Sequence, residues 1–237
     1  MPSDTLMTSD PKRSLDLLWG RMRPPSPSRR GPKPRLTAEV VAASAVELAD
    51  AEGLPAIAMR RMAERLGVAT MSLYTYVPGK AELVDLMLDH VHAEPVPRAE
   101  GSPREHLAAT ARAAWSLHRR HPWMLEVGHA PLGPNRMARY ERDLRGLEGV
   151  GLSDLEMGQI LALVSDYVAG AVRSARATQA PQEAASLPDE MLDAGRFPAA
   201  VRVGAARLER PDPDAAFEFG LARLLDGLDA LIAARRA

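Results

Sequence analysis

Residues 59–83 read MRRMAERLGVATMSLYTYVPGKAEL, and this stretch decides how the rest of the chain is interpreted. Apolar side chains recur at helical spacing up to Leu66, with charged side chains between them, which predicts a short helix over 58–66. Gly67 allows a tight turn, because glycine adopts the left-handed conformation that ends many helices. A second short helix is predicted over 70–77. The pattern is typical of a helix-turn-helix, although an ordinary small helical bundle also contains it.

Helices are also predicted on both sides of this stretch. Thr37 is a good N-cap for a helix over 37–52, because its hydroxyl accepts a hydrogen bond from the first turn. Gly53 follows as a stop signal. A fourth helix is predicted over 79–92, after a Pro-Gly pair that interrupts the chain. These helices make residues 37–93 a candidate DNA-binding domain.

The residues of this domain resemble the DNA-binding domain of the TetR (tetracycline-repressor) family. The shared features are a Leu-Gly-Val turn at 66–68, a Leu-Tyr-x-Tyr-Val reading helix at 73–77 and a Lys-x-x-Leu start of the next helix at 80–83. The match covers residues 37–92 without gaps. It implies a homodimer whose two recognition helices enter successive major grooves of a pseudo-palindromic, double-stranded DNA operator. It also implies a small-molecule ligand that binds in the C-terminal part and releases the DNA.

The predicted reading helix carries side chains that suit contacts with DNA. The hydroxyls of Thr70 and Ser72 can bond phosphates or base edges, and Met71 can contact a thymine methyl group. The charge of Lys80 is unfavourable at a helix N-terminus unless a phosphate binds there as well. Core packing is the alternative role for Tyr76. The resemblance places DNA contacts at Arg60, Thr70, Ser72, Tyr74, Tyr76 and Lys80.

Two alanines depart from the family pattern. Ala58 stands where members often have a Ser or Thr cap that also touches phosphate. Ala69 lacks the polar group that a base contact at that position would need. We therefore expect fewer base contacts from the reading helix and a larger contribution from the N-terminal segment.

The charge of the chain is unevenly distributed. Its 237 residues contain 30 Lys+Arg and 31 Asp+Glu, so the formal net charge of −1 does not by itself suggest a nucleic-acid partner. Residues 1–36 carry a net charge of +5 and several prolines, which predicts a basic, flexible arm. An apolar cluster at 15–19 can form a helical turn there. A solvated tail and a DNA-binding arm both fit, and in the second case the contacts are Arg29, Arg30, Lys33 and Arg35.

Residues 103–237 predict a second, all-helical domain. Capping boxes, in which a Ser and a Glu three residues later satisfy backbone donors reciprocally, open helices at 103 and 154. The last helix begins at 212–213, and residues 180–196 are expected to contain a loop with a short helix. Asn135 is expected to cap a further helix, with an inner stripe of Met137, Tyr140, Leu144 and Leu147.

The last helix carries an apolar stripe with heptad-like spacing. Its members step by four and three residues, as in a coiled coil. Such a stripe forms either core within the chain or a seam between two copies, and its short length does not distinguish the two. The seam would be a dimer interface of Phe217, Leu221, Leu224, Leu228 and Leu231.

A ligand-responsive regulator needs a cavity in its second domain. Aromatic, methionine and histidine side chains suit the walls of a site for a small organic molecule, although each is also an ordinary core residue. His118, His121 and His129 are close in sequence, but no carboxylate completes a metal site, so no metal or cofactor is expected. The ligand candidates are Trp115, His118, Trp123, Met124, Met137, Tyr140, Met157, Tyr167 and Phe197.

The sequence also argues against several classes of protein. It contains no Cys, which excludes disulfides, iron–sulfur clusters and a cysteine nucleophile. It has no nucleophile elbow, glycine-rich phosphate loop or His-Glu-x-x-His helix, so we do not expect an enzyme. No apolar run approaches the ~18 residues of a membrane span, and residues 1–30 lack the apolar core of a signal peptide. We therefore expect a cytoplasmic protein.

The interpretation that accounts for most of these features is an all-α, two-domain, homodimeric repressor of the TetR type. Residues 37–93 would bind DNA, and residues 103–237 would bind ligand and dimerise. An activator or corepressor-dependent regulator remains an alternative within this class. Outside it, the alternatives are a helical ligand carrier without DNA binding and a helical-bundle enzyme formed by residues 103–237.

Overall fold

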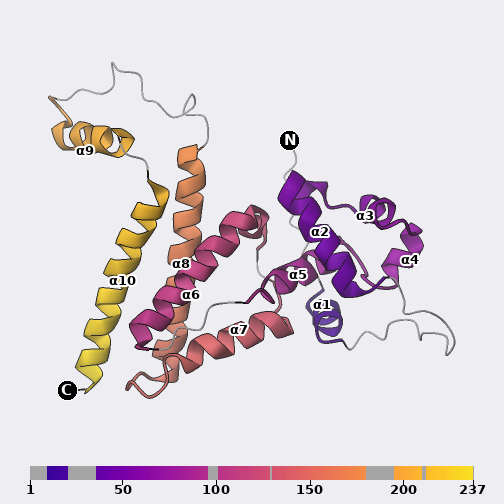
Figure 1. The fold of residues 1–237 in the computed structure, drawn as a ribbon, viewed down its shortest axis with the longest axis horizontal. Helices are drawn as coiled ribbons and strands as arrows, with labels where there is room; N and C mark the ends of the chain where they lie inside the picture. The colour runs from indigo at the N-terminus through magenta and orange to yellow at the C-terminus, as the bar shows by residue number, and fades with distance from the viewer. Residues whose placement is uncertain are drawn as a thin grey trace. The chain divides into compact units, whose positions relative to one another are not determined.

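The computed structural model describes residues 10–20, 36–95, 101–128, 130–179, 195–209 and 212–236, and within these ranges all regular secondary structure is helical (Figure 1). The all-α prediction is therefore confirmed. The α-helices are α1 (Pro11–Leu18), α2 (Ala38–Glu52), α3 (Met59–Leu66), α4 (Thr70–Tyr74), α5 (Lys80–Val91), α6 (Pro103–Arg120), α7 (Pro134–Arg145), α8 (Asp154–Gln179), α9 (Pro198–Glu209) and α10 (Pro213–Arg236). Two 3-10 helices, η1 (Leu54–Ala56) and η2 (Pro122–Glu126), lie between them.

The chain divides into two compact units, Met1–Gly149 and Val150–Ala237. The first unit contains α1 to α7, and the second contains α8 to α10. The first unit thus extends past the sequence interval 93–103, where a domain boundary was expected, and includes α6 and α7. Each unit is described by itself below.

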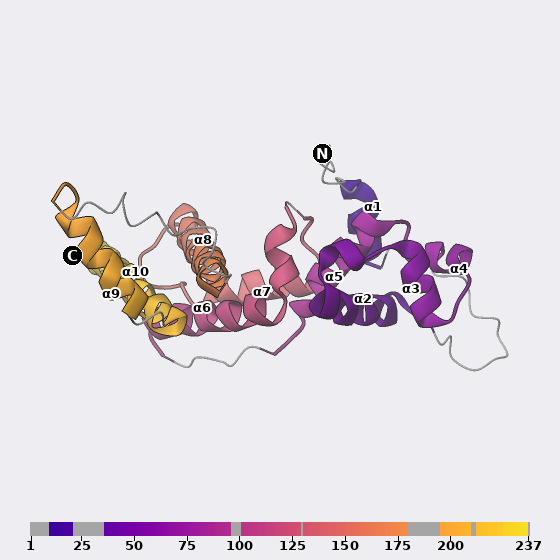
Figure 2. The ribbon, with the colours of Figure 1, turned by 90° about the horizontal axis from the view of Figure 1, so that it is seen from above.

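The helices around the quoted stretch form the core of the first unit. Met62, Leu73 and Met87, from α3, α4 and α5, are fully buried. The hydroxyl of Thr37 accepts a hydrogen bond from the Val40 amide at 3.2 Å, so the predicted N-cap of α2 is confirmed. The predicted helix-turn-helix is α3 followed by α4 (Figure 2).

The turn between α3 and α4 depends on Gly67. Its φ of 66° lies in the left-handed region, and its amide bonds back to the carbonyls of the last turn of α3. Helix α4 ends at Tyr74, earlier than the predicted end at 77. Beyond Tyr74 the chain continues as a turn, in which the amides of Tyr76 and Val77 both donate to the Leu73 carbonyl.

Residues 11–18 depart from the predicted flexible arm. They form α1, which packs on α5 with Leu17 and Leu18 buried, so the expected helical turn at 15–19 is present and docked. The fully buried Ser14 donates a hydrogen bond to a carboxylate oxygen of Asp85 at 2.5 Å. The Trp19 indole donates to the carbonyl of Leu132 at 3.1 Å. The prediction of an arm that is flexible over 1–36 is therefore wrong for α1.

The start of α7 differs from the prediction. Gly133, not Asn135, is the N-cap, and it has no side chain with which to cap the helix. Asp89 of α5 supplies the missing acceptor, because its carboxylate accepts from the amides of Asn135 at 3.3 Å and Arg136 at 3.0 Å. A Cβ at Gly133 would lie 2.3 Å from that carboxylate, so this close approach requires glycine. The cap of α7 is thus provided by a residue distant in the sequence.

Helix α7 also presents a different face to the core than predicted. Met137 and Tyr140 are 38% and 40% exposed, whereas Arg139 and Asp143 are buried. Of the predicted stripe, Leu147, which follows the helix, is fully buried. The apolar stripe was therefore wrong at Met137 and Tyr140, because buried polar partners orient this helix.

The second unit is built on the pair α8 and α10, which run side by side (Figure 1). Ile160, Val164 and Val168 on α8 are buried, as their helical spacing predicts. Phe217, Leu221 and Leu228 on α10 are 2%, 1% and 5% exposed in the single chain. The stripe therefore packs as core within the chain, which is one of the two roles that the sequence left open for it. The remaining two seam residues, Leu224 and Leu231, are half-buried.

Two features of this unit were not predicted. Helix α9 begins at Pro198, after the expected loop, while residues 180–194 lie outside the described ranges. Judged by length and composition alone, residues 154–177 of α8 are long and apolar enough to cross a membrane. Only 22% of the most apolar stretch of this segment is buried in the structure. Leu155 and Leu163 account for part of this exposed apolar surface. An exposed apolar surface on a helix that packs against α10 also suits a partner protein.

Candidate functional site

The reading helix α4 has one buried anchor and an exposed outer surface. Leu73 is 0% exposed and fixes the helix on the core of the first unit. Met71 is 78% exposed and Tyr74 is 41% exposed, and Ser72 is exposed beside them. Thr70, the first residue of the helix, is half-buried. This surface offers hydroxyl, phenol and thioether groups, which suits phosphate and base contacts.

The helix starts near this surface have free backbone donors. Ala58, Ala69 and Gly79 are the N-caps of α3, α4 and α5, and none makes a side-chain capping hydrogen bond. The two alanines noted in the sequence therefore do leave these helix ends uncapped. Lys80 is the first residue of α5 and is half-buried. Uncapped amides and an ammonium group together suit a phosphate oxygen.

The arginines of α3 have different roles. Arg61 pairs with Glu52 at 2.6 Å, and Arg65 pairs with Glu47 at 2.9 Å, so both hold α3 on α2. Among the described residues, Arg60 pairs within its own helix, with Glu64, and its side chain is 87% exposed. Such an exposed pair contributes little stability and leaves Arg60 available to DNA. The predicted arm contacts Arg29, Arg30, Lys33 and Arg35 lie outside the described residues.

Tyr76 occupies an intermediate position. It lies in the turn after α4, is half-buried and packs against the core of the first unit. Its ring therefore has the structural role that was the alternative to DNA contact. A test of DNA contact at this residue must keep the ring and remove only the hydroxyl.

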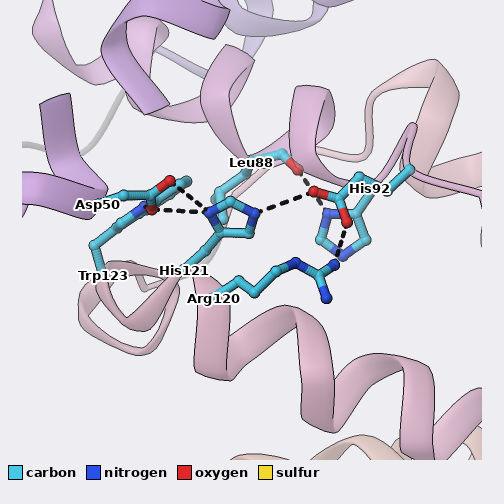
Figure 3. Close-up of polar contacts among 7 residues, drawn as sticks. Asp50, Leu88, His92, Arg120, His121 and Trp123 are labelled. Atoms are coloured by element: carbon cyan, nitrogen blue, oxygen red, sulfur yellow. Dashed lines mark hydrogen bonds and ion pairs between the residues drawn. The ribbon is translucent and has the colours of Figure 1, made fainter. Parts of the chain in front are cut away.

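Sequence reasoning missed a polar network that joins three parts of the first unit (Figure 3). His121, at the end of α6, is buried between two carboxylates. Its Nδ1 lies 2.8 Å from an oxygen of Asp50 on α2, and its Nε2 lies 3.2 Å from an oxygen of Glu94, just after α5. The Trp123 indole donates to Asp50 at 2.8 Å, and Arg120 pairs with Glu94. The network therefore ties α2 and the end of α5 to the end of α6.

The chemistry of this network places hydrogen-bond donors against two carboxylates. A carboxylate only accepts hydrogen bonds, and each ring nitrogen of His121 faces one. Burial raises the pKa of Glu94, but hydrogen bonds from His121 and Arg120 outweigh it and bring that pKa below its usual range. No signal in the sequence paired His121 with Asp50, because the two are 71 positions apart.

His92 lies next to this network but is neutral near pH 7. Its Nδ1 donates to the Leu88 carbonyl at 2.6 Å (Figure 3). Burial lowers its pKa to about 4, and the nearby positive charges of Arg139, Arg136 and His118 act in the same direction. A neutral histidine is thus held beside several cations.

The predicted ligand residues are divided between the two units. Trp123 and Met124 belong to the core that also holds α2 and α5. On α6, Trp115 is buried, with the Arg119 guanidinium 5.6 Å from its ring centre, and His118 donates to the Ala114 carbonyl at 2.9 Å. The remaining candidates are exposed or half-buried, namely Met137 and Tyr140 on α7, and Met157, Tyr167 and Phe197 in the second unit.

Tyr167 has a structural role in the second unit. Its hydroxyl donates to the Phe217 carbonyl at 2.6 Å, and the two rings stack with centres 5.7 Å apart. These contacts join α8 to α10. Among the described residues, no group of three or more metal-ligating side chains comes together.

The chain is similar to a known protein family and to several characterised proteins. A family described as "Tetracyclin repressor-like, C-terminal domain" matches residues 95–232. The HTH-type transcriptional repressor DrrR1 of Streptomyces coeruleorubidus is 41% identical over 251 residues, which cover 99% of this chain and 91% of that protein. The Tetracycline repressor protein class C of Escherichia coli is 30% identical over 206 residues, covering 83% and 92% of the two chains.

Solved structures give the same result. Apo ActR from Streptomyces coelicolor superposes with a TM-score of 0.72 and 31% identity, covering 84% of this chain and 99% of that chain. The complex of ActR with actinorhodin has a TM-score of 0.71 and 30% identity, covering 84% and 97%.

Proposed function

The chain belongs to the TetR family of transcriptional repressors, and from this premise we propose that it binds a pseudo-palindromic operator as a homodimer and leaves it when a small molecule binds. It is a transcriptional regulator and not an enzyme. We assign DNA binding to residues 37–93, and ligand binding and dimerisation to residues 103–237. The basic residues within 1–36 would add contacts to the DNA backbone.

The observation that carries DNA binding is the outer surface of α4. Its only buried side chain is Leu73, while Met71, Ser72 and Tyr74 are exposed. Exposed apolar side chains grouped on one helix suit a surface that a partner covers. The major groove accommodates one helix and offers phosphate oxygens, base edges and thymine methyl groups to these side chains.

Dimerisation is supported by apolar side chains on the second unit. Leu155 and Leu163 on α8 are 70% and 55% exposed, and Phe219 on α10 is 68% exposed. They lie outside the stripe with which α8 and α10 pack on each other. Contact with the same surface of a second copy would bury them, as expected for the isologous interface of a two-fold dimer.

Coupling between ligand and DNA is supported by the contacts of α5. This helix packs on α2 and so helps to hold the reading helix. At its other side, Asp89 caps α7, and Glu94 beyond its end binds His121 of α6. A ligand that favours a different arrangement of α6 and α7 would therefore move α5. The ligand needs a difference in affinity between the two states of about 1–3 kcal/mol.

The test begins with the selection of bound sequences from random duplex DNA by the full chain. We expect a palindromic site, and a site without two-fold symmetry would contradict a homodimer. Tyr74→Ala should weaken binding of the selected DNA about tenfold or more, since a base or phosphate contact is worth about 1–3 kcal/mol. Tyr140→Ala is the matched control, because that tyrosine is 40% exposed against 41% for Tyr74 and lies on α7. Equal loss in both variants would contradict the assignment of α4.

Tyr76→Phe tests the remaining tyrosine without removing its packed ring. If its hydroxyl contacts DNA, binding weakens while the unfolding temperature is unchanged. The selected DNA then serves to screen metabolites in a gel-shift titration. Release of DNA supports a repressor of the proposed kind, and tighter binding would show dependence on a corepressor instead.

A further inference from the structure

Arg139 is a buried arginine in the middle of α7, in the first unit. The residue is only 9% exposed. The Nη2 atom of its guanidinium has no hydrogen-bond partner among the described residues. Leaving a buried donor of a charged group unpaired costs stability, so such a group needs an explanation. Burial also lowers the pKa of Arg139, which the nearby Asp143 opposes.

The acids around Arg139 already have other partners. One oxygen of Asp143 accepts from Nε and Nη2 of Arg142 at 3.2 and 2.9 Å, and from the Thr110 hydroxyl at 3.1 Å. Glu94 is bound by His121 and Arg120. The printed hydrogen bonds of these two acids thus go to other groups, and Nη2 of Arg139 has no hydrogen-bond partner among the described residues, although Asp143 and Glu94 attract its charge.

The neighbourhood of Arg139 contains further positive or hydrogen-bond-donating groups. Arg136 and His118 act electrostatically on the same buried His92 as Arg139 does. The Nε2 atom of His106 is buried without a hydrogen-bond partner, at 3.8 Å from the nearest oxygen of Asp143. Arg136 faces Asp89 and Asp85. Two buried nitrogens without partners, Arg139 Nη2 and His106 Nε2, thus occur on the facing helices α7 and α6.

We propose that Arg139 is the anchor for a carboxylate group of the small molecule that this regulator senses, so that the effector is an organic acid. This inference rests on the proposed function, in which the helices α6 and α7 respond to a ligand. A carboxylate matches the planar guanidinium and neutralises its charge, and a hydrogen bond to a charged partner is about twice as strong as a neutral one. Before the ligand binds, the unpaired arginine is unfavourable, and the acid removes that penalty.

A carboxylate fits better than a phosphate. A phosphate group carries more charge and more acceptor oxygens, and proteins usually bind it with several cations or with the free amides of a helix start. Arg139 lies in the interior of α7, whose amides are bonded within the helix, and the start of that helix is occupied by Asp89. A single guanidinium without helix amides is the simpler match for one carboxylate.

The experiment compares aromatic acids with their amides, which have the same shape and lack the charge. Benzoate, 2-naphthoate, benzamide, 2-naphthamide and inorganic phosphate are added to the full chain, and thermal shift and titration calorimetry report binding. We expect the two acids to raise the unfolding temperature and to bind at least tenfold more tightly than the amides. Failure of both acids to bind, equal binding of acids and amides, or binding of phosphate alone overturns the proposal.

Variants of α7 locate the anchor. Arg139→Gln should abolish the preference for acids, and Arg139→Lys should keep the charge but weaken binding, because it lacks the planar fork. Arg145→Gln is the control, since that side chain is 69% exposed and pairs with Glu141 on the same helix. If Arg139→Gln retains the preference for acids, Arg139 is not the anchor.

Stability and DNA binding without ligand separate this proposal from its alternatives. Removal of an unpaired buried charge should leave the unfolding temperature of the free protein unchanged or raise it, whereas loss of a purely structural arginine would lower it. Arg139→Gln should bind the selected operator as the wild type does. If neither protein binds DNA, the proposed function fails, whatever the result with the acids.

Discussion

His92 should make the protein less stable in mild acid, by an amount that follows from its burial. Its pKa in the folded chain is about 4, against 6.5 for an unperturbed histidine. Between these values the unfolded chain binds a proton that the folded chain does not bind, so the stability falls as the pH is lowered through this window. The stability that the neutral ring contributes is fully retained above a pH of 6.5, and no further loss occurs below a pH of about 4.

The size of this effect can be calculated from the two pKa values. At about pH 4.5 they correspond to a loss of about 2.5 kcal/mol relative to about pH 8, which is a large part of the stability of a typical domain. The physical origin is the burial of the ring, with Arg139, Arg136 and His118 adding repulsion of the charged form. The hydrogen bond from Nδ1 to the Leu88 carbonyl favours the proton on that nitrogen but does not compensate for burial.

The assay is urea unfolding at a fixed protein concentration over this pH range, with the wild type and His92→Gln in parallel. Glutamine keeps a donor for the Leu88 carbonyl and cannot titrate. Effects of other groups, including Glu94, cancel in the difference between the two proteins. We expect the difference in unfolding free energy to shrink by about 2.5 kcal/mol from about pH 8 to pH 4.5. Parallel profiles would refute the assignment of a neutral, buried His92.

Three further predictions follow from named contacts. Gly133→Ala places a Cβ 2.3 Å from the carboxylate of Asp89 and should destabilise the protein by about 1–3 kcal/mol, measured by urea unfolding; an unchanged midpoint would show that this cap is dispensable. Ser14→Ala leaves the buried Asp85 without its 2.5 Å donor and should cost about 1–3 kcal/mol, with faster proteolysis of the N-terminal segment as a second readout. Replacing the basic residues between α1 and α2 with Gln should reduce the salt dependence of operator binding by about 0.9 in logarithmic slope for each lost phosphate contact, while an unchanged slope would exclude their contact with DNA; the residues are Arg29, Arg30, Lys33 and Arg35.

Most of the DNA-binding half could be predicted from the sequence. Its helices depend on local signals, such as the cap at Thr37, the glycine turn at Gly67 and the spacing of Met62 and Leu73. The exposed residues of α4 were predicted for the same reason, because helical spacing separates the buried Leu73 from its neighbours. The end of α4 was misjudged, because the apolar spacing of Leu73 and Val77 continues into a turn whose amides bond back to Leu73.

The part of the chain after residue 103 was predicted less well where polar groups are buried. Apolar spacing predicted that Met137 and Tyr140 on α7 face the core. In the structure, Arg139 and Asp143 are buried instead. A buried charge needs a partner, and Thr110, which donates to the buried Asp143, lies on α6 rather than on α7. The stripe of α10 was identified correctly as buried, but its partner was left open, and the structure supplies α8.

The sequence by itself determined the helical class, the helix-turn-helix and the caps of helices whose partners lie within four residues. These are local properties, because propensity, periodicity and capping act along one turn of the chain. Only the tertiary structure decided the cap of α7 by Asp89, the anchoring of α1 by Ser14 and Asp85, and the position of His121 between two carboxylates. These contacts join residues 47, 71 and 71 positions apart, and no local pattern specifies such a distance. The buried Nη2 of Arg139 belongs to the same group, since its lack of a hydrogen-bond partner among the described residues depends on how several helices pack.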